Sequence, residues 1–256
     1  MKYAQKNTTM LKTQEILELF ISQEKLSLQE MVLQTGLPRT SLLRMVASLE
    51  EMGFLEKDPE GRYGLGLVFL RFGDLVAKRL DIRTIALPVM RKLQEESDEA
   101  VNLVVLKGDE GVYIEKVDTS HPVKVYTDIG RRAPLYGGAC PRVLLAYMPP
   151  AEQERYIRET ELVRYAEGTI LDKDELRREL AKVRRDGYAY SGGELRDFTA
   201  AVAAPIYNQT GAVVASLSLA GLAERFKGEN LTRLIKLVKE AAFEISRRLG
   251  WRPAGD

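Results

Sequence analysis

The apolar positions of residues 26–66 follow helical spacing twice and then change to short runs, which predicts two helices and a hairpin. Ser27 followed by Glu30 is the sequence of a capping box at the start of the first helix. Gly36 supplies the left-handed residue that ends this helix, and Pro38 suits the first turn of the next one. The second helix is expected to bury one face, formed by Leu42, Leu43, Val46 and Leu49.

A predicted wing follows the second helix. Residues 54–57 and 62–64 are strand-like, and Asp-Pro-Glu-Gly at residues 58–61 forms the turn between them. A helix, a turn, a second helix and a wing in this order form a device that enters the major groove of DNA. The alternative is a helical packing module that contacts no nucleic acid. We expect DNA contacts from the exposed start of the second helix and from the wing, through Arg39, Thr40, Ser41, Arg44 and Arg62.

The chain is expected to divide after the wing. Residues 1–66 form the winged helix-turn-helix domain, residues 67–82 a linker helix, and residues 83–256 a second domain. The linker helix has an apolar stripe that either packs on a partner helix or covers its own domain. Its members are Leu67, Leu70, Leu75, Val76 and Leu80.

The second domain is predicted to be α+β, with an antiparallel sheet flanked by helices, because most of its strand-like runs are linked as hairpins. A loop at residues 130–140 leads into the helix that starts at Pro141. Strands are expected at residues 101–107, 112–118, 122–128, 188–194, 200–207 and 212–220. Helices are expected at residues 82–96, 141–148, from about 151, 172–187 and 231–249.

The net charge and the counts of cysteine and histidine exclude several classes of function but do not identify one. The 256 residues include 38 Lys and Arg against 37 Asp and Glu, a formal net charge of +1, so no global basicity indicates DNA binding. Modest electrostatic affinity implies that more than one copy must bind together. The single cysteine, Cys140, and the single histidine, His121, exclude an intrachain disulfide and a cluster of Cys or His metal ligands. We expect no metal and no cofactor.

The chain also lacks the pattern of a membrane protein. No apolar run approaches 18 residues, and the N-terminus has no apolar signal core. The expectation is a cytoplasmic protein with no membrane partner.

The whole pattern resembles the IclR (isocitrate lyase regulator) family of bacterial transcription factors over nearly its full length. Four segments carry the resemblance: TGLPRTSLLRMVASLEEMGFLEK, APLYGGACPRVLLAYMP, RRDGYAYSGGE and AAVAAPIYNQTGAVVASLSLAG. The resemblance implies a winged helix, a linker helix and a C-terminal effector domain like the GAF fold. It also implies a DNA-bound dimer, often a dimer of dimers, and a small-molecule ligand. A dimer would read a near-palindromic operator.

The start of the Pro141 helix is expected to bind an anion, because backbone N–H groups there lack intrahelical partners and the helix dipole adds positive potential. In the family, the amides that match Ala139 and Cys140 hold an effector carboxylate. The resemblance further implies Ser191 and Ser218 as polar anchors. It places Val125, Ala133, Thr199, Ala201, Ala220 and Ala223 in the walls. Small apolar walls predict a roomier, less polar pocket, which an aromatic or sugar-derived acid fits at least as well as a two- or three-carbon acid.

Cys140 has other interpretations. It is a small residue suited to a tight helix entrance, and a helix N-terminus can also lower a thiol pKa and make it reactive. The alternative function is therefore a thiol hydrolase that uses Cys140 with His121, joined to an adaptor helix-turn-helix. That function requires the two side chains within hydrogen-bond reach, whereas a regulator requires only an open pocket beside Cys140. The sequence favours the regulator over an enzyme, since no hydrolase or metal motif accompanies the pair.

Overall fold

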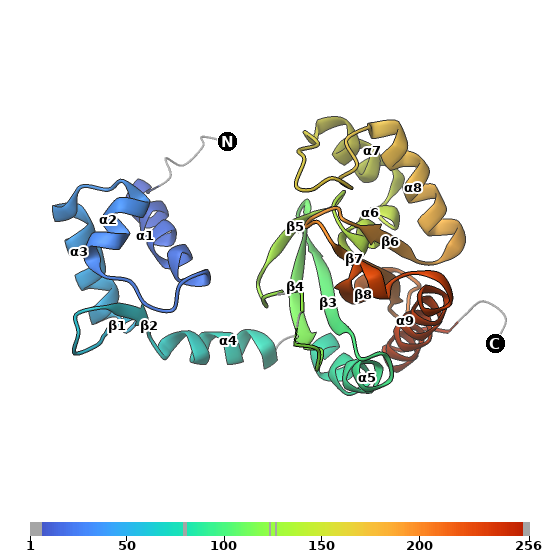
Figure 1. Cartoon of the computed structure of the whole chain (residues 1–256), viewed down its shortest axis with the longest axis horizontal. Helices are drawn as coiled ribbons and strands as arrows, with labels where there is room; N and C mark the ends of the chain where they lie inside the picture. Colours follow the sequence, from blue (N-terminus) through green and yellow to red (C-terminus); the bar gives the residue numbers. More distant parts are fainter. Residues whose placement is uncertain (1–6, 79–80, 123, 126, 253–256) are drawn as a thin grey trace. The chain divides into compact units, whose positions relative to one another are not determined.

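The computed structural model describes residues 7–78, 81–122, 124–125 and 127–252, and the chain forms two compact units, Met1–Arg79 and Leu80–Asp256. The first unit is a winged helix-turn-helix followed by one helix (Figure 1). Its elements are α1 (Thr8–Glu18), a 3-10 turn η1 (Leu19–Ile21), α2 (Leu28–Thr35), α3 (Arg39–Glu51), β1 (Leu55–Lys57), β2 (Tyr63–Leu65) and α4 (Val68–Lys78).

The predicted capping box is confirmed. The Ser27 hydroxyl accepts from the Glu30 amide at 3.3 Å, and the Glu30 carboxylate accepts from the Ser27 amide at 2.7 Å. Gly36 ends α2 with a φ of 65°, a left-handed conformation that a residue without Cβ adopts freely. Pro38 is the N-cap of α3, one position before the first helical turn. Helix α1, which Asn7 caps, was not among the predicted helices.

The core of the first unit corrects one prediction. Leu42, Val46 and Leu49 are buried in α3, whereas the side chain of Leu43 is 49% exposed. Successive residues of a helix are about 100° apart, so Leu43 turns away from the line that Leu42, Val46 and Leu49 form. The buried face of α3 packs on α1, α2 and the wing through Ile16, Phe20, Leu26, Met31, Leu37, Leu55 and Tyr63.

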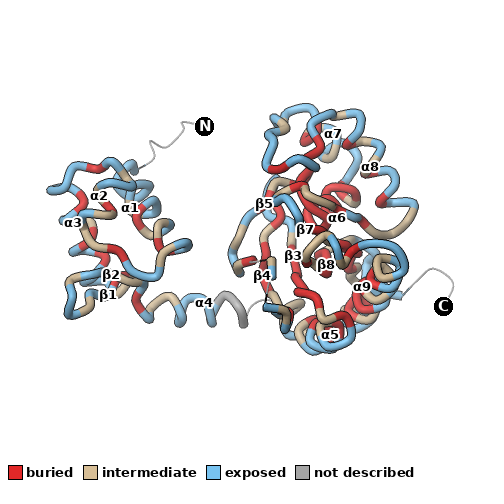
Figure 2. The backbone as a smooth tube through the Cα atoms, in the orientation of Figure 1, coloured by how far each residue is buried: buried red, intermediate tan, exposed pale blue. Residues whose placement is uncertain are grey.

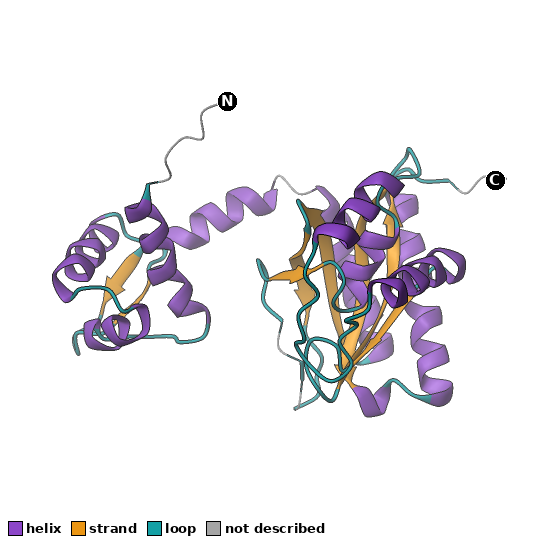
Figure 3. Ribbon diagram, turned by 90° about the horizontal axis from the view of Figure 1, so that it is seen from above, coloured by secondary structure: helices purple, strands orange, loops and turns teal. Residues whose placement is uncertain are grey.

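The second unit has a six-stranded antiparallel sheet in the order β5-β4-β3-β8-β7-β6 between two layers of helices (Figures 1 and 3). Its strands are β3 (Ala100–Lys107), β4 (Glu110–Val117), β5 (Arg132–Pro134), β6 (Ala189–Gly192), β7 (Thr199–Tyr207) and β8 (Val213–Leu222). Its helices are α5 (Asp81–Ser97), α6 (Ala139–Ala146), α7 (Pro150–Glu159), α8 (Lys173–Asp186), the 3-10 turn η2 (Ala223–Arg225) and α9 (Gly228–Arg248).

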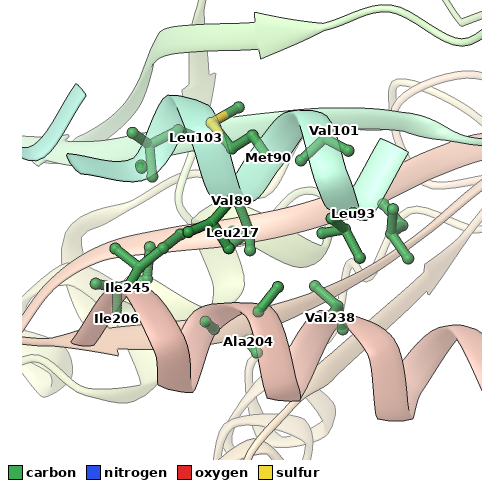
Figure 4. Packing of buried hydrophobic residues seen from close by; sticks show 14 of the residues in the cluster. Val89, Met90, Leu93, Val101, Leu103, Ala204, Ile206, Leu217, Val238 and Ile245 are labelled. Atoms are coloured by element: carbon green, nitrogen blue, oxygen red, sulfur yellow. The ribbon is translucent and has the colours of Figure 1, made fainter. Parts of the chain in front are cut away.

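The two faces of the sheet have different coverings. One face packs on α5 and α9, where Val89 and Met90 of α5 and Val238 and Ile245 of α9 meet the strands (Figure 4). The other face packs on α6, α7 and α8. In Figure 2, α6 and much of the central strands are coloured as buried, whereas α7 and α8 are largely exposed. Since side chains of a strand alternate between faces, each strand divides its residues between these layers.

Two predictions in the second unit are wrong. Residues 122–128 form no strand in the described part of the chain, and the strand that pairs with β4 is β5, within the predicted loop 130–140. Pro122 has no N–H to donate, while Gly130 turns the chain and donates to the Tyr113 carbonyl at 2.7 Å, which starts the pairing. Helix α6 begins at Ala139, so Ala139 and Cys140 are its first residues instead of preceding it.

Candidate DNA-reading face and effector cavity

The outward face of α3 presents the residues expected to contact DNA. Arg39, Thr40, Ser41 and Arg44 are all exposed. Arg39 and Arg44 make no ion pair with any residue that the structure describes. Leu43, which the sequence placed in the core, lies on this exposed side as well. The start of α3 therefore offers two free guanidinium groups, two hydroxyls and an apolar side chain.

Arg62 differs from the α3 arginines because it is held by its own unit. Its guanidinium donates to the Lys25 carbonyl at 2.8 Å and lies 3.8 Å from the Glu30 carboxylate. Lys25 in turn pairs with Asp58 in the wing turn at 2.9 Å. The hydrogen bond from Lys25 is the largest cause that lowers the pKa of Asp58. These contacts tie the wing to the loop before α2 and leave Arg62 only partly free to meet a ligand.

A groove runs between α1 and α3 in the same unit, with a volume of about 820 Å³. Met10 of α1 and Met52 at the end of α3 are more than half exposed there. Ser41 and Arg44 lie on the α3 side of this groove. The exposed apolar surface continues past the wing, where Leu67 and Leu70 are 69% and 71% exposed. Of the predicted linker stripe, the side chain of Val76 and the residue Leu80 lie outside the described residues.

The second unit holds a cavity of about 60 Å³ beside the first turn of α6. The strands that line it are β3, β4, β6, β7 and β8, together with Val125, Thr127, Arg131 and the segment that joins β6 to β7. Predicted site residues meet here: Val125, Ala139, Cys140, Ser191, Thr199, Ala201, Ser218 and Ala220. Residues from distant parts of the chain are thus brought to one place.

Two predicted wall residues lie elsewhere. Ala133 is buried in β5, opposite Gly111 of β4, and packs in the cluster around α6 to α8. Ala223 is in η2, where its amide donates to the Phe198 carbonyl at 2.8 Å. Neither residue is in the lining of the cavity.

The cavity is smaller and has more polar side chains in its lining than the small apolar wall positions alone imply. Its volume of about 60 Å³ is below the roughly 150 Å³ of an enclosed cavity that holds benzene. The lining includes charged and polar side chains beside the small residues: Asn102, Tyr113, Thr127, Arg131, Glu194 and Arg196. These larger side chains occupy the space that the alanines alone would leave open.

Cys140 is a buried neutral thiol at the start of α6. Burial raises its pKa to about 11, against the effects of Ser216 and Ser218, which interact with the sulfur. Its Sγ donates to the Ser216 carbonyl at 3.5 Å. His121 lies beside Asp98 instead, with 3.4 Å between Nε2 and the carboxylate. The hydrogen bond that a Cys140–His121 hydrolase needs is therefore not formed, and the burial that raises the thiol pKa opposes a reactive thiolate.

A buried ion pair joins α6 to the segment after β6. The Arg142 guanidinium contacts the Glu194 carboxylate and also donates to the carbonyls of Tyr190 at 3.0 Å and Tyr136 at 3.2 Å. Glu194 accepts from the Gly138 amide at 3.1 Å, directly at the N-cap of α6. Burial raises the pKa of Glu194, partly offset by Arg142 and the Gly138 amide. An internal carboxylate thus already occupies one amide of this helix start.

Sequence reasoning missed Arg142, Glu194 and Asn102. Arg142 is 1% exposed and Asn102 2% exposed, so both are fully inside the domain. The Oδ1 atom of Asn102 accepts no hydrogen bond from any residue that the structure describes. The signal for Asn102 was present, because it is the only polar residue in the run Ala-Val-Asn-Leu-Val-Val-Leu. Arg142 and Glu194 gave no such signal, since each resembles an ordinary surface charge.

Within residues 7–252, apart from the undescribed positions, no group of three His, Cys, Asp or Glu side chains is arranged to hold a metal ion. None of the helices that the structure describes has the length and apolarity to cross a membrane.

A winged helix-turn-helix joined to an α+β unit with its own cavity defines the class of two-domain transcriptional regulators. The models for the IclR helix-turn-helix domain and for the C-terminal domain of the bacterial transcriptional regulator IclR match residues 10–59 and 75–247. The chain therefore belongs to the IclR family and is a transcriptional regulator of that type.

Relatives agree along the whole length. The chain is 49% identical over 246 residues to the HTH-type transcriptional regulator KipR of Bacillus subtilis. The match covers 96% of this chain and 98% of KipR. The crystal structure of IclR from Thermotoga maritima matches 95% of this chain and 99% of its own, with 31% identity and a TM-score of 0.81. An IclR homolog from Microbacterium hydrocarbonoxydans, solved in complex with 4-hydroxybenzoate, matches 94% of this chain and 98% of its own, with 26% identity and a TM-score of 0.78.

Proposed function

We propose that this regulator binds a near-palindromic operator as a dimer or a dimer of dimers, and that a small organic acid in the cavity beside α6 controls that binding. The observation that carries the DNA part is the exposed face of α3, where Arg39 and Arg44 have no ion-pair partner among the described residues. In a winged helix-turn-helix, residues at the start of the second helix reach base edges, and wing residues reach the backbone or the minor groove. Arg39, Thr40, Ser41 and Arg44 take the first role, and Arg62 the second.

Selection of binding sites from random-sequence DNA tests the operator. Two copies of α3 related by a two-fold axis should enrich an inverted repeat whose half-sites lie about 10 base pairs apart, or a multiple of that. Enrichment of single half-sites alone would contradict a symmetric dimer on DNA.

The exposed apolar side chains near α4 support self-association. Leu67, Leu70, Phe72 and Leu75 are 69%, 71%, 48% and 46% exposed, a larger apolar surface than isolated surface leucines make. Light scattering at micromolar concentration should therefore give a mass of at least twice that of one chain. A mass of one chain at that concentration would refute the dimer.

The acid-sensing part depends on the first turn of α6. The amides of Ala139 and Cys140 belong to a helical turn that has no intrahelical acceptors for them, and the helix dipole favours an anion at this end. Arg131 and Arg196 also line the cavity, and neither has an ion pair with a described residue. Ser191 and Ser218 supply hydroxyls that orient the acid, while Ala201 and Ala220 give it space. The volume favours acids of a few carbons over aromatic acids.

A matched pair of measurements tests this site. Acetate, propionate, lactate and 4-hydroxybenzoate are titrated against the full chain by thermal shift, and each acid that binds is added to the complex with the selected DNA. The acid should raise the melting temperature by mass action and change the affinity for DNA.

Ala201→Trp is the variant for this site, because a Trp at this lining position fills the cavity. It should abolish both responses and leave DNA affinity without acid unchanged. A folded Ala201→Trp protein with an undiminished response would place the acid elsewhere.

A further inference from the structure

Among the described residues that line the cavity, Asn102 is the one whose side chain has a buried polar atom without a hydrogen-bond partner from the described part of the chain. Asn102 is 2% exposed, lines the cavity, and its Oδ1 accepts no hydrogen bond. Buried polar atoms are nearly always hydrogen-bonded, and each exception calls for an explanation. A bound molecule with an N–H or O–H group would supply the missing donor.

The register of the sheet explains why Asn102 faces the cavity. Its neighbours Val101 and Leu103 belong to the apolar cluster under α5 and α9. Side chains alternate along a strand, so Asn102 emerges on the opposite face, the side of α6. There it lies directly opposite Ser218 of β8, whose hydroxyl interacts with the Cys140 thiol at the start of α6. Asn102 is therefore connected, through Ser218 and Cys140, to the helix end where the acid is placed.

The other polar groups around the cavity differ in the hydrogen bonds that they can make. Arg131, Arg196 and the first amides of α6 can only donate hydrogen bonds, so they suit the anionic end of a ligand. Ser191 and Thr127 are buried hydroxyls, which can donate or accept. Glu194 is already committed to Arg142 and to the Gly138 amide. Asn102 Oδ1 remains as the buried acceptor without a donor.

We propose that Asn102 recognises a hydrogen-bond donor of the effector, so the effector is a small carboxylic acid that also carries a hydroxyl or an N–H group. This inference rests on the proposed acid-binding role of the cavity and narrows its ligand class. An acid without a donor leaves Oδ1 unpaired after the cavity closes on it, and sites built around a hydrogen bond discriminate strongly against the analogue that lacks it.

Pairs of acids with the same shape test the proposal. Lactate is compared with propionate, which lacks the hydroxyl, and oxamate with pyruvate, which carries a methyl group in place of the N–H donors. The first pair tests a hydroxyl and the second an N–H group. Affinities for the full chain are measured by calorimetry. The donor-bearing acid should bind about tenfold more tightly in at least one pair, the worth of one hydrogen bond to a buried acceptor.

Variants separate recognition from structure. Asn102→Leu should remove this preference, leaving less than about a twofold difference within the pair. It should not lower the melting temperature of the ligand-free protein, because it removes a buried acceptor that has no partner. Asn102→Ala is measured beside it in case leucine overfills the site. Asn230→Leu is the matched control, since Asn230 is half-buried and donates to the Arg225 carbonyl. It should lower the melting temperature and keep the preference for donor-bearing acids.

The outcomes are distinguishable. Equal binding within both pairs, or a preference that survives in both Asn102 variants, would overturn the recognition by Asn102 while leaving the acid site in place. Failure of all four acids and of those in the wider panel to bind the wild-type chain would reject the acid site itself, and this inference with it. DNA selection by the same protein reports on the regulator independently of either result.

Discussion

Helices α3 and α6 both carry arginines, but their charges have opposite surroundings. Arg39 and Arg44 of α3 are exposed and have no ion pair among the described residues. Arg142 of α6 is 1% exposed and is held by Glu194 and two backbone carbonyls. An exposed guanidinium is available to an external phosphate or base, whereas a buried one is consumed by the fold. The same residue type is therefore available to a binding partner in one unit and part of the folded core in the other.

This difference predicts where a substitution acts. Removing an exposed arginine should change binding and leave the fold intact, because surface substitutions usually alter stability by less than about 0.5 kcal/mol. Removing a buried one leaves its carboxylate without a counter-charge inside the domain. Variants of both kinds of arginine therefore measure how far effects on binding and effects on stability are separated.

Arg142→Leu should destabilise the protein by about 3–5 kcal/mol, because it leaves Glu194 buried and unpaired. Urea unfolding followed by circular dichroism measures the loss. The double variant Arg142→Leu/Glu194→Leu is the control, and it should recover part of the stability because both charges are gone. A single variant as stable as the wild type would show that the pair contributes nothing to the fold.

The same variant has a predicted pH dependence. Burial raises the pKa of Glu194 even beside Arg142, and without Arg142 that pKa rises further. A carboxyl whose folded pKa is raised binds more protons in the folded state than in the unfolded state, so stability is gained as pH falls and lost as pH rises through the folded pKa. The deficit of Arg142→Leu should accordingly be smaller at pH 5 than at pH 8. An equal deficit at both pH values would mean that Glu194 does not take up a proton.

Cys140 extends the comparison to reactivity within α6. Since burial raises its pKa to about 11, its thiolate fraction at pH 8 should be roughly 100-fold below that of an ordinary cysteine. Alkylation by iodoacetamide, followed by mass spectrometry, should therefore be at least 100-fold slower in the folded protein than in urea. Equal rates in the two states would restore the reactive-thiol interpretation.

Arg44→Ala tests the exposed side. If Arg44 reads a base, the variant should lose about 1–3 kcal/mol of specific operator binding. If it contacts only phosphate, binding to all sequences should weaken together and the salt dependence should decrease. In both cases the urea midpoint should stay where it is. Fluorescence anisotropy with selected and random DNA separates these outcomes, and unchanged binding to both DNAs would remove Arg44 from the DNA-reading face.

The sequence predicted the local features of α2 and α3 better than the composition of the cavity. The capping box of Ser27 and Glu30 and the exposed arginines depend on residues within one or two helical turns, which a periodic pattern reports directly. Leu43 was wrongly predicted to be buried, because two adjacent leucines cannot be assigned to a helix face until all buried positions of the helix are known. Arg142 and Glu194, by contrast, lie 52 positions apart, and only the folded sheet brings them together.

Most of the cavity residues could be predicted only from the family resemblance, which placed Ser191, Thr199, Ala201, Ser218 and Ala220 in one site. The resemblance also placed Ala133 and Ala223 in the walls, and neither is in the lining of the cavity, since a position in a motif does not determine which way a side chain points. Its implied volume failed for a related reason. The alanines were considered without the larger side chains of Tyr113, Arg131 and Leu195 that share the lining.

Arg62 is the intermediate case and gives the smallest expected effect. Its side chain is exposed like those of Arg39 and Arg44, yet it donates to the Lys25 carbonyl and lies near Glu30, as a structural arginine does. Arg62→Ala should therefore cost at most about 1 kcal/mol of stability, the usual upper value for an exposed pair. Its loss of DNA binding should be smaller than that of Arg44→Ala and should decrease at high salt, because a wing arginine contacts phosphate more than base edges.

Arg62→Lys is the matched control: it keeps the positive charge that attracts phosphate and loses the planar guanidinium that reaches the Lys25 carbonyl. If Arg62→Lys restores DNA binding without restoring the unfolding midpoint, the two roles of Arg62 are separate. If neither measurement changes in Arg62→Ala, the wing is held by Lys25 and Asp58 alone, and α3 carries the recognition without it.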